Sequence, residues 1–302
     1  MKENKITIFT PTYNRAYIIN DLYESLKRQT YKKFEWIVVD DGSTDGTGQL
    51  FKKWIATEKQ FSIRYYKKEN GGKHRAINYG LDLAEGGIFF VVDSDDQLTP
   101  DALEKINNWF KQISNEPNMK GIVANKGYTA TVTANDYFSE SHLDKTMLEM
   151  GSYTENGKNV LSGERAIAFY TDFHRLYKFP QFDGENFMTE AVVYNRMAHD
   201  GYKMRFFNDI IWIYEYQEDG LTKAGNQLFI NNPHGYGLWL KEKADFTGAT
   251  WMDKLKLYYT FTCELLNYHD KRTIAECIGT STLVITLCSV VHKMIRFLKE
   301  KR

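Results

Sequence analysis

Three carboxylates fall within four residues of this sequence, in the run Asp93-Ser94-Asp95-Asp96. The run follows residues 88–92, an apolar stretch short enough to be a buried central strand. Carboxylates this close repel one another, and a bound divalent cation removes that repulsion. Because the ligands are hard oxygens, they favour Mg²⁺ or Mn²⁺ over zinc. We predict a metal site with the candidate ligands Asp93, Asp95 and Asp96; the alternative is a solvated acidic turn.

Two more predicted strands end in polar residues. Residues 5–10 are followed by Pro11-Thr12-Tyr13-Asn14, and residues 34–39 are followed by Asp40-Asp41-Gly42. Each segment taken alone is ordinary turn chemistry. In open parallel sheets, however, ligands bind beyond the carboxyl ends of the strands. Three polar strand ends in one chain therefore predict a shared ligand site.

A group of basic residues opens a predicted helix in the segment Asn70-Gly71-Gly72-Lys73-His74-Arg75. Cations are more usual at the other end of a helix, because the macrodipole makes the N-terminus positive. The same N-terminus binds anions through its free N–H groups. A bound phosphate accounts for the group, and we predict Lys73 beside it. The alternative is that these side chains only decorate an exposed first turn.

The elements around these motifs alternate between strand and helix. Predicted strands over residues 5–10, 34–39, 62–67 and 88–92 are each followed by an apolar pattern at helical spacing. This alternation predicts an α/β fold with a parallel sheet and helices on both faces. Further along, residues 204–207 and 211–216 predict two more strands.

Composition excludes several classes of protein. The 302 residues include 39 Lys+Arg and 39 Asp+Glu, and this zero net charge argues against a nucleic-acid partner. Three cysteines, all within the last forty residues, exclude a disulfide scaffold and indicate a reducing compartment. The first five residues do not have the pattern of a signal peptide. We therefore expect a globular protein of the cytoplasm.

The motifs together resemble glycosyltransferase family 2. The resemblance is carried by the runs Ile8-Phe9-Thr10-Pro11-Thr12-Tyr13-Asn14-Arg15, Val38-Val39-Asp40-Asp41-Gly42-Ser43-Thr44-Asp45 and Val92-Asp93-Ser94-Asp95-Asp96. It is most specific over residues 5–113. It implies a GT-A type α/β fold, with a mostly parallel Rossmann-like sheet flanked by helices and, here, a helical C-terminal extension. It also implies transfer from a nucleotide-diphospho-sugar with inversion at the anomeric carbon.

The resemblance implies roles for individual residues. Asp41 accepts a hydrogen bond from a uracil N–H, which favours a uridine donor, and Asp93 lies at the ribose. Asp95 is the metal ligand of the Asp-X-Asp motif, and the metal neutralises the departing diphosphate. Residues 11–13 line the base. The predicted nucleotide-sugar site comprises Pro11, Thr12, Tyr13, Asn14, Asp41, Lys73, Asp93, Ser94 and Asp95.

An inverting transfer needs a base that removes the proton of the acceptor hydroxyl. The family commonly supplies it from a Glu-Asp pair that opens a helix, followed by an Arg and then a Gly. Glu190 matches the first acidic position, with Arg196 and Gly201 after it, but Ala191 stands where the Asp is expected. Glu190 is our first candidate and Glu185 its competitor. The alternative is that both are solvated carboxylates at a helix start.

We predict a catalytic domain over residues 1–225, with a nucleotide-binding half (1–113) and an acceptor half (114–225). A helical region, 226–302, ends in a basic amphipathic helix. Residues 277–292 carry no formal charge and, as a helix, span about 24 Å, short of a hydrocarbon core of about 30 Å. Five basic residues and one acidic residue lie in 293–302. We expect residues 277–302 to lie on a membrane surface, or else to pack on the domain or a second subunit.

These features predict an inverting enzyme that moves a single hexosyl-type sugar from a UDP-sugar, with Mn²⁺ or Mg²⁺. We expect the acceptor to be a glycan or a polyprenyl-diphosphate-linked sugar, in bacterial cell-surface polysaccharide synthesis at the inner face of the membrane. No Gln-X-X-Arg-Trp motif occurs, which favours single addition. Oligomeric state stays open. The alternatives are a sugar-1-phosphate nucleotidyltransferase and a non-catalytic sugar-nucleotide- or glycan-binding protein.

Overall fold

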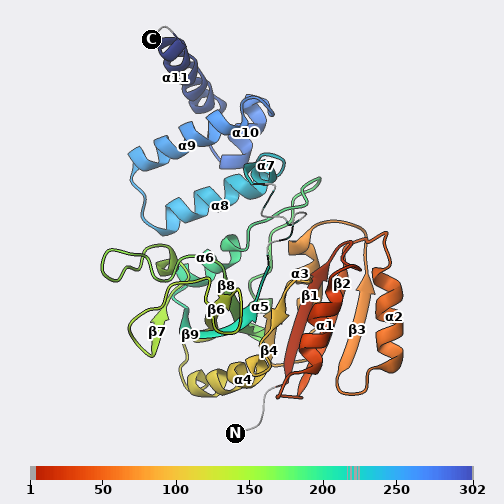
Figure 1. Cartoon of the computed structure of the whole chain (residues 1–302). Helices are drawn as coiled ribbons and strands as arrows, with labels where there is room; N and C mark the ends of the chain where they lie inside the picture. Colours follow the sequence, from red (N-terminus) through yellow and green to blue (C-terminus); the bar gives the residue numbers. More distant parts are fainter. Residues whose placement is uncertain (1–4, 216, 218–219, 221–222, 224, 301–302) are drawn as a thin grey trace. The chain divides into compact units, whose positions relative to one another are not determined.

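The structure is a computed structural model that describes residues 5–215, 217, 220, 223 and 225–300 (Figure 1). Contacts within the chain divide it into two compact units. The first comprises Met1–Lys178 and Met197–Glu218, and the second comprises Phe179–Arg196 and Asp219–Arg302. Residues 179–196 thus group with the C-terminal part of the chain. The domain boundary predicted at residue 225 stays a prediction.

The first half of unit 1 is a parallel sheet with strand order β3-β2-β1-β4. Its elements in chain order are β1 (Ile6–Thr12), α1 (Ile19–Lys27), β2 (Phe34–Asp40), α2 (Thr47–Thr57), β3 (Ser62–Lys67), α3 (Lys73–Leu83), β4 (Ile88–Val91) and, after a short strand, α4 (Ala102–Ile113). The predicted alternation of strands and helices is therefore confirmed. Strands β1 and β2 are buried along their whole length, as expected of central parallel strands covered on both faces.

Close packing fixes α3 on the sheet. Phe9 of β1 and Phe89 of β4 stack with their ring centroids 5.4 Å apart. A side chain at Gly80 of α3 would place its Cβ 2.1 Å from the Phe9 ring. Glycine is therefore required at this position, because it lets α3 lie directly against the aromatic pair.

Strand β1 is longer than predicted, since it runs through Pro11 to Thr12. Proline has no N–H to donate and is tolerated only where a sheet needs no donor. The backbone groups of Phe9 and Pro11 point toward β4 rather than β2. The hydrogen-bonded ladder between β1 and β4, however, ends at the pair Phe9 and Val91. Pro11 therefore breaks no ladder hydrogen bond, and its partner on β2 is Val39.

The rest of the sheet is mixed. Strand β8 (Arg165–Tyr170) lies antiparallel between β4 and β6 (Met119–Gly127), and β9 (Lys203–Ile213) runs parallel to β6. Two short strands, β5 (Gln97–Leu98) and β7 (His142–Lys145), pair antiparallel with β9. In the described part of the chain these nine strands form one sheet. The predicted α/β architecture with flanking helices is confirmed.

The prediction of two strands at 204–207 and 211–216 is wrong, because β9 is one strand through Asn208 and Asp209. The register of β9 against β6 shifts beside this polar pair, which is how a bulge carries a strand past it. The Asn208 amide also pairs with the Phe138 backbone, with Nδ2 donating to the carbonyl at 2.9 Å. Residue 216 lies outside the described residues.

Unit 2 contains a run of helices, as predicted for the C-terminal region. They are α7 (Asn226–Ile230), α8 (Pro233–Phe246), α9 (Trp251–Leu265), α10 (Lys271–Ile278) and α11 (Thr282–Glu300), with the start of α6 (Ala191–His199) before them. Phe261, Leu265, Ile274, Ile278 and Ile285 form their buried core. Asp270 caps α10 by accepting from the N–H groups of Arg272 and Thr273.

Among the described residues, length and composition would let no individual helix cross a membrane. The pair Lys271–Ile278 and Thr282–Leu298 meets that test together, with a bend of 116° between its halves.

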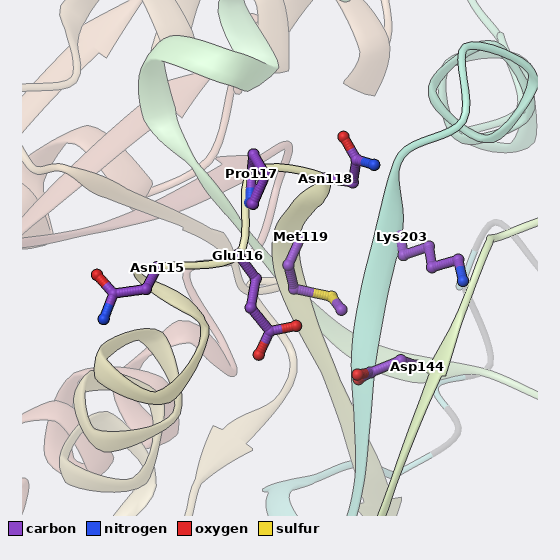
Figure 2. Close-up of a pocket in the computed structure, with 7 residues that line it drawn as sticks. All are labelled: Asn115, Glu116, Pro117, Asn118, Met119, Asp144 and Lys203. Atoms are coloured by element: carbon purple, nitrogen blue, oxygen red, sulfur yellow. The ribbon is translucent and has the colours of Figure 1, made fainter.

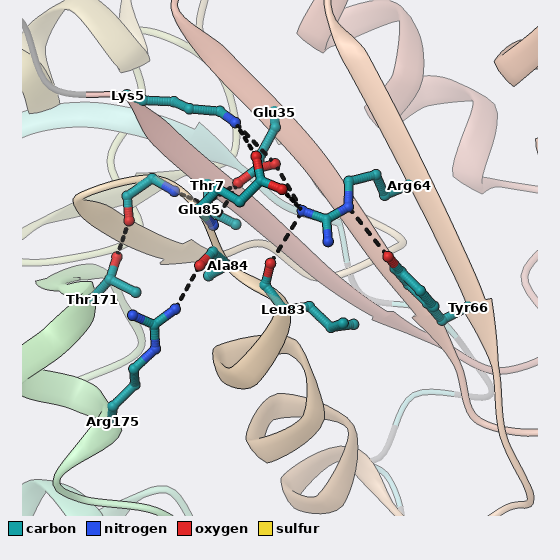
Figure 3. A network of polar contacts seen from close by, with 11 residues as sticks. Lys5, Thr7, Glu35, Arg64, Tyr66, Leu83, Ala84, Glu85, Thr171 and Arg175 are labelled. Atoms are coloured by element: carbon teal, nitrogen blue, oxygen red, sulfur yellow. Dashed lines mark hydrogen bonds and ion pairs between the residues drawn. The ribbon is translucent and has the colours of Figure 1, made fainter.

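A buried carboxylate lies at the amino edge of the parallel sheet and connects the elements there (Figure 3). Glu35 of β2 is fully buried and accepts from the Thr7 hydroxyl at 2.7 Å, the Glu85 N–H at 2.8 Å and Arg64 at 3.2 Å. Lys5 lies 3.2 Å from the same carboxylate. Burial alone raises the pKa of Glu35, but these donors outweigh it and hold the pKa below its ordinary value. The network ties β1, β2 and β3 to the turn before β4.

Candidate functional site

Three loops of unit 1 leave neighbouring strands at the carboxyl edge of the sheet, after β1, β2 and β4. The ends of β1 and β2 are in register, since Thr12 pairs with Asp40 and the Asp41 N–H donates to the Thr12 carbonyl at 2.8 Å. On the other side, the Val92 N–H donates to the Phe9 carbonyl at 2.8 Å. The structure therefore brings the three predicted polar strand ends to one edge.

Asn14 braces the loops after β1 and β2. Its backbone is left-handed, with φ 52°, a conformation that asparagine tolerates better than most residues. Its N–H donates to the Ser43 hydroxyl at 2.7 Å, and its side-chain oxygen accepts from the Thr44 N–H at 2.8 Å. Neighbouring Tyr13 is half exposed, whereas the Thr12 hydroxyl is buried and has no hydrogen-bond partner among the described residues. Asn14 thus shapes a loop on which an aromatic ring faces solvent.

Asp41 joins the loop after β2 to the turn that opens α3. Its carboxylate accepts from the N–H of Gly71 at 3.0 Å, from the N–H of Gly72 at 2.7 Å and from the Lys68 ammonium at 2.5 Å. The side chain is only 7% exposed. A carboxylate offers about four acceptor positions, so these donors leave one for a ligand. Recognition of a uracil N–H by Asp41 stays a prediction.

Lys73, the first residue of α3, connects the glycine turn to the acidic loop, by which we mean Asp93–Asp96. Its ammonium lies 2.7 Å from an Asp93 oxygen, with about a third of each side chain exposed. The predicted anion site and the predicted metal site are therefore adjacent. His74 differs from its neighbours, because it is buried; burial above all, aided by Arg75, lowers its pKa to about 4. It is neutral at pH 7 and adds no charge to the site.

The carboxylates of the acidic loop lie in unequal surroundings. Burial raises the pKa of Asp93, but Lys73 and Lys126 outweigh it and bring the pKa below its ordinary value. Burial and then the charge of Asp93 raise the pKa of Asp95. Burial, against an opposing effect of Lys126, raises the pKa of Asp96 to about 7. Asp93 and Asp95 are partly exposed, whereas Ser94 and Asp96 are buried.

Within the described ranges, no three His, Cys, Asp or Glu side chains are grouped to hold a metal. Mg²⁺, however, is usually held by one or two carboxylates together with waters and substrate phosphates. Partly exposed Asp93 and Asp95 fit that pattern of hard oxygen donors, and buried Asp96 fits it less well. The complete predicted ligand set of Asp93, Asp95 and Asp96 stays a prediction.

Lys126 also acts on this site, although no pattern in the sequence predicted it. It lies on β6, is 5% exposed, and places its ammonium 4.0 Å from the centre of the Trp212 ring. Its charge acts on both Asp93 and Asp96. Strand β6 is two places from β4 in the sheet, with β8 between them. Only this strand order brings Lys126 near the acidic loop.

Glu185 is held by the start of α8 in unit 2. It is 6% exposed on its side chain, and it accepts from the N–H of His234 at 2.7 Å and of Gly235 at 2.9 Å. The His234 ring lies 2.8 Å from the same carboxylate. In return, Asn232 accepts from the N–H groups of Asn186 and Phe187. Glu185 therefore caps α8 and fastens its own segment.

Glu190 lies just before α6 and is only partly buried. Its carbonyl accepts from the N–H groups of Val193 and Tyr194, so its backbone begins the helix. Arg196, one of the residues that supported the match to the family pattern, makes a bidentate pair with Glu242 of α8 at 2.6 and 2.9 Å. Of the two candidate bases, Glu190 has the more accessible side chain.

A pocket of about 350 Å³ lies elsewhere in unit 1 (Figure 2). It is lined by Asn115, Glu116, Pro117, Asn118, Met119, Asp144 and Lys203. Met119 and Lys203 open strands β6 and β9, so the pocket is at the amino edge of the sheet. Arg205 pairs with both acidic residues of the lining, at 2.8 Å from Glu116 and 2.6 Å from Asp144. None of the predicted site residues lines this pocket.

The mixed sheet and its polar carboxyl edge define an α/β protein of the GT-A type. The chain belongs to glycosyl transferase family 2, whose family model matches residues 7–180. The resemblance inferred from the motifs is therefore confirmed.

Curated relatives share part of the chain. Glycosyltransferase GlyA of Streptococcus pneumoniae is 25% identical, over 76% of this chain and 33% of its own length. TuaG of Bacillus subtilis, named for teichuronic acid biosynthesis, is 35% identical over 33% of this chain and 39% of its own length. The chain thus spans about a third of the length of GlyA.

Solved structures cover nearly the whole chain. The Staphylococcus aureus protein TarS, residues 1–349, in complex with UDP-GlcNAc has a TM-score of 0.59 at 14% identity, over 96% of this chain and 92% of that one. The mannosyltransferase PcManGT of Pyrobaculum calidifontis, with GDP-Man and Mn²⁺, has a TM-score of 0.57 at 19% identity, over 97% of this chain and 81% of that one. At these identities the likeness shows the fold alone.

Proposed function

We propose that this protein is a metal-dependent inverting glycosyltransferase that moves one hexosyl-type sugar from a UDP-sugar to an acceptor hydroxyl. The pair between Lys73 and Asp93 carries the proposal, because it joins the cationic start of α3 to the acidic loop. Cationic groups at a helix start favour a diphosphate and carboxylates favour its metal, so the two kinds of group side by side suit both. Membership of glycosyl transferase family 2 supports the reaction class.

Asp95 and Asp93 are the residues that would hold Mn²⁺ or Mg²⁺. When bound, such an ion stabilises the negative charge that develops on the departing diphosphate. Lys73 helps to lower the pKa of Asp93, and its partly exposed side chain would reach the same phosphates. The complex of PcManGT with GDP-Man and Mn²⁺ supports a divalent metal here.

Asp41 and the loop at residues 11–14 are the proposed base-binding surface. Asp41 keeps one acceptor position for a uracil N–H, and the half-exposed Tyr13 ring offers a face for stacking. The UDP-GlcNAc bound by TarS supports a uridine donor. GDP-Man, bound by PcManGT, is the competitor that the experiment below separates.

Glu190 is the proposed general base that takes the acceptor proton. Glu190 is only partly buried, which supports this role, whereas Glu185 is held at the start of α8 by its hydrogen bonds. We propose as acceptor a glycan or polyprenyl-diphosphate-linked sugar of bacterial cell-surface polysaccharide synthesis. The name of TuaG supports that setting.

A thermal-shift comparison of UDP, GDP, CMP and NAD, each with Mn²⁺ and with EDTA, tests the proposal. A ligand at a hundred times its dissociation constant stabilises a protein by about 2.7 kcal/mol. We expect stabilisation by UDP that requires Mn²⁺, followed by turnover with one of a panel of UDP-sugars. Stabilisation by GDP alone would replace the uridine donor. A shift that ignores the metal, with no transfer, would favour a binding protein or a nucleotidyltransferase.

A further inference from the structure

Helix α11 has one face committed to unit 2. Ile285 and Ser289 are almost fully buried, and Cys288 is 9% exposed. His292, one turn further along this face, lies 3.0 Å from the Cys263 sulfur of α9. This face packs the first half of α11 on its neighbours, and it is built from small or polar residues as much as from large apolar ones.

The other face carries large apolar side chains in contact with solvent. Five of them follow one another at intervals of three or four residues, and the sixth, Leu298, lies four residues after Met294, which places all six on one side of the helix. Their exposed fractions lie between 50% and 69%, and they are Leu283, Leu287, Val290, Met294, Phe297 and Leu298. We name this set the apolar face of α11. Such a continuous exposed apolar surface marks an interaction site rather than a core.

The charges on α11 identify the partner. Lys293 is exposed beside the apolar face, Arg296 is exposed one turn after His292 on the other side of the helix, and Lys299 follows in the sequence. Glu300 is the one acidic residue of the α11 sequence. A second copy of the chain, docked on the same face, would bring like charges together, whereas an anionic lipid surface would neutralise them. The predicted basic residues Lys301 and Arg302 lie outside the described residues.

We propose that the apolar face of α11 docks on an anionic membrane surface. The helix lies in the headgroup region, with its apolar side chains toward the acyl chains and Lys293 at the lipid phosphates. This arrangement buries the exposed apolar side chains without disturbing the face that packs on α9 and α10. The inference rests on α11 alone, so it stands or falls independently of the proposed transfer reaction.

Co-sedimentation of the full chain with lipid vesicles tests it. We expect binding to vesicles of phosphatidylcholine with phosphatidylglycerol, much weaker binding to phosphatidylcholine alone, and a decline as salt is added. Met294→Asp and Leu287→Asp should each weaken binding by about tenfold or more, because a charge replaces an apolar side chain that becomes buried when the helix docks on the membrane. Lys293→Gln should weaken it by about fivefold.

Thr282→Asp is the matched control, since it adds the same charge at an exposed position off the apolar face. It should retain binding, and all variants should keep the melting temperature and Mn²⁺-dependent nucleotide binding of the parent. Equal binding of Met294→Asp and parent would overturn the proposal, as would equal binding to the two kinds of vesicle. A dimer in lipid-free solution that Met294→Asp dissociates would also overturn it, in favour of a subunit interface.

Discussion

The carboxylates of this chain lie in two contrasting kinds of surroundings. Glu35, Asp41 and Glu185, which we call the anchoring carboxylates, are each at most 7% exposed on the side chain. Each accepts a hydrogen bond from at least one backbone N–H group and further hydrogen bonds from other donors of the protein. Asp95 and Asp96 of the acidic loop are the opposite case, since burial and neighbouring carboxylates raise their pKa values, to about 7 at Asp96.

The difference separates acids whose charge is compensated by protein donors from acids that an added cation would stabilise. An anchoring carboxylate repays its desolvation through hydrogen bonds that close a turn or begin a helix. A crowded carboxylate is repelled by its neighbours, and an added cation relieves that repulsion. Substitutions should therefore lower stability at the anchoring carboxylates, of which Asp41 is also the proposed uracil acceptor, and weaken ligand binding without loss of stability at the acidic loop.

The largest effect is expected at the acidic loop. Asp95→Asn should lower the transfer rate by about 10³-fold, since it removes a ligand of the ion that stabilises the leaving group. The thermal shift produced by UDP with Mn²⁺ should disappear, while the melting temperature without ligand should not fall. Asp82→Asn, at an exposed ion pair with Lys178, is the matched control and should leave both readouts intact. Normal Mn²⁺-dependent UDP binding by Asp95→Asn would show that Asp95 does not hold the metal.

Glu190→Gln should reduce transfer by about 10²- to 10³-fold, because the amide cannot take the acceptor proton. Stabilisation by UDP with Mn²⁺ should persist, since donor binding does not need the base. Steady-state rates together with thermal shifts measure the two effects separately. Transfer at the parental rate would remove Glu190 from the mechanism.

Glu35→Gln should destabilise unit 1 by about 2–3 kcal/mol. Removing one partner of a buried ion pair leaves the other charges uncompensated, but Lys5 and Arg64 remain partly hydrated, which moderates the loss. Urea unfolding followed by circular dichroism measures the difference. A change below about 0.5 kcal/mol, the range of ordinary surface substitutions, would mean that Glu35 anchors nothing.

The stability of the parent protein and of Glu35→Gln can also be compared as a function of pH. The folded-state pKa of Glu35 is lowered, so its contribution is complete above its ordinary value of 4.5 and is lost as the pH falls through the folded-state pKa. The stability difference between parent and Glu35→Gln should therefore shrink on acidification, because both side chains become neutral. Other titrating groups are common to the two proteins and cancel. A difference that stayed constant or grew would contradict the lowered pKa.

The smallest effect is expected at Glu185. Glu185→Gln should cost about 1–2 kcal/mol, because a neutral amide oxygen still accepts one helix N–H but loses the charge that favours the α8 N-terminus. Transfer under conditions where the protein stays folded should fall less than twofold. A loss of transfer as large as that of Glu190→Gln, at unchanged stability, would make Glu185 the base and break the division between the two kinds of carboxylate.

Local sequence patterns were sufficient for the first half of unit 1. Strand and helix alternate there in short segments whose apolar periodicity is clear, and β3 begins and ends where it was predicted. They were insufficient where the outcome depended on a distant strand. Pro11 stays in β1 only because β4 ends early, and β9 stays whole only because its register against β6 shifts.

By itself, the sequence determined the family, the order of the first elements and the acidic loop, because these depend on residues close together in the chain. The tertiary structure decided which acidic side chains find hydrogen-bond donors and positive charges within the protein. Glu185 resembles Glu190 in the sequence, but its partners at His234 and Gly235 lie some fifty residues away. Lys126 reaches the acidic loop only through the strand order of the sheet. The charge and hydrogen bonding of a side chain depend on such distant neighbours, and folding alone brings them together.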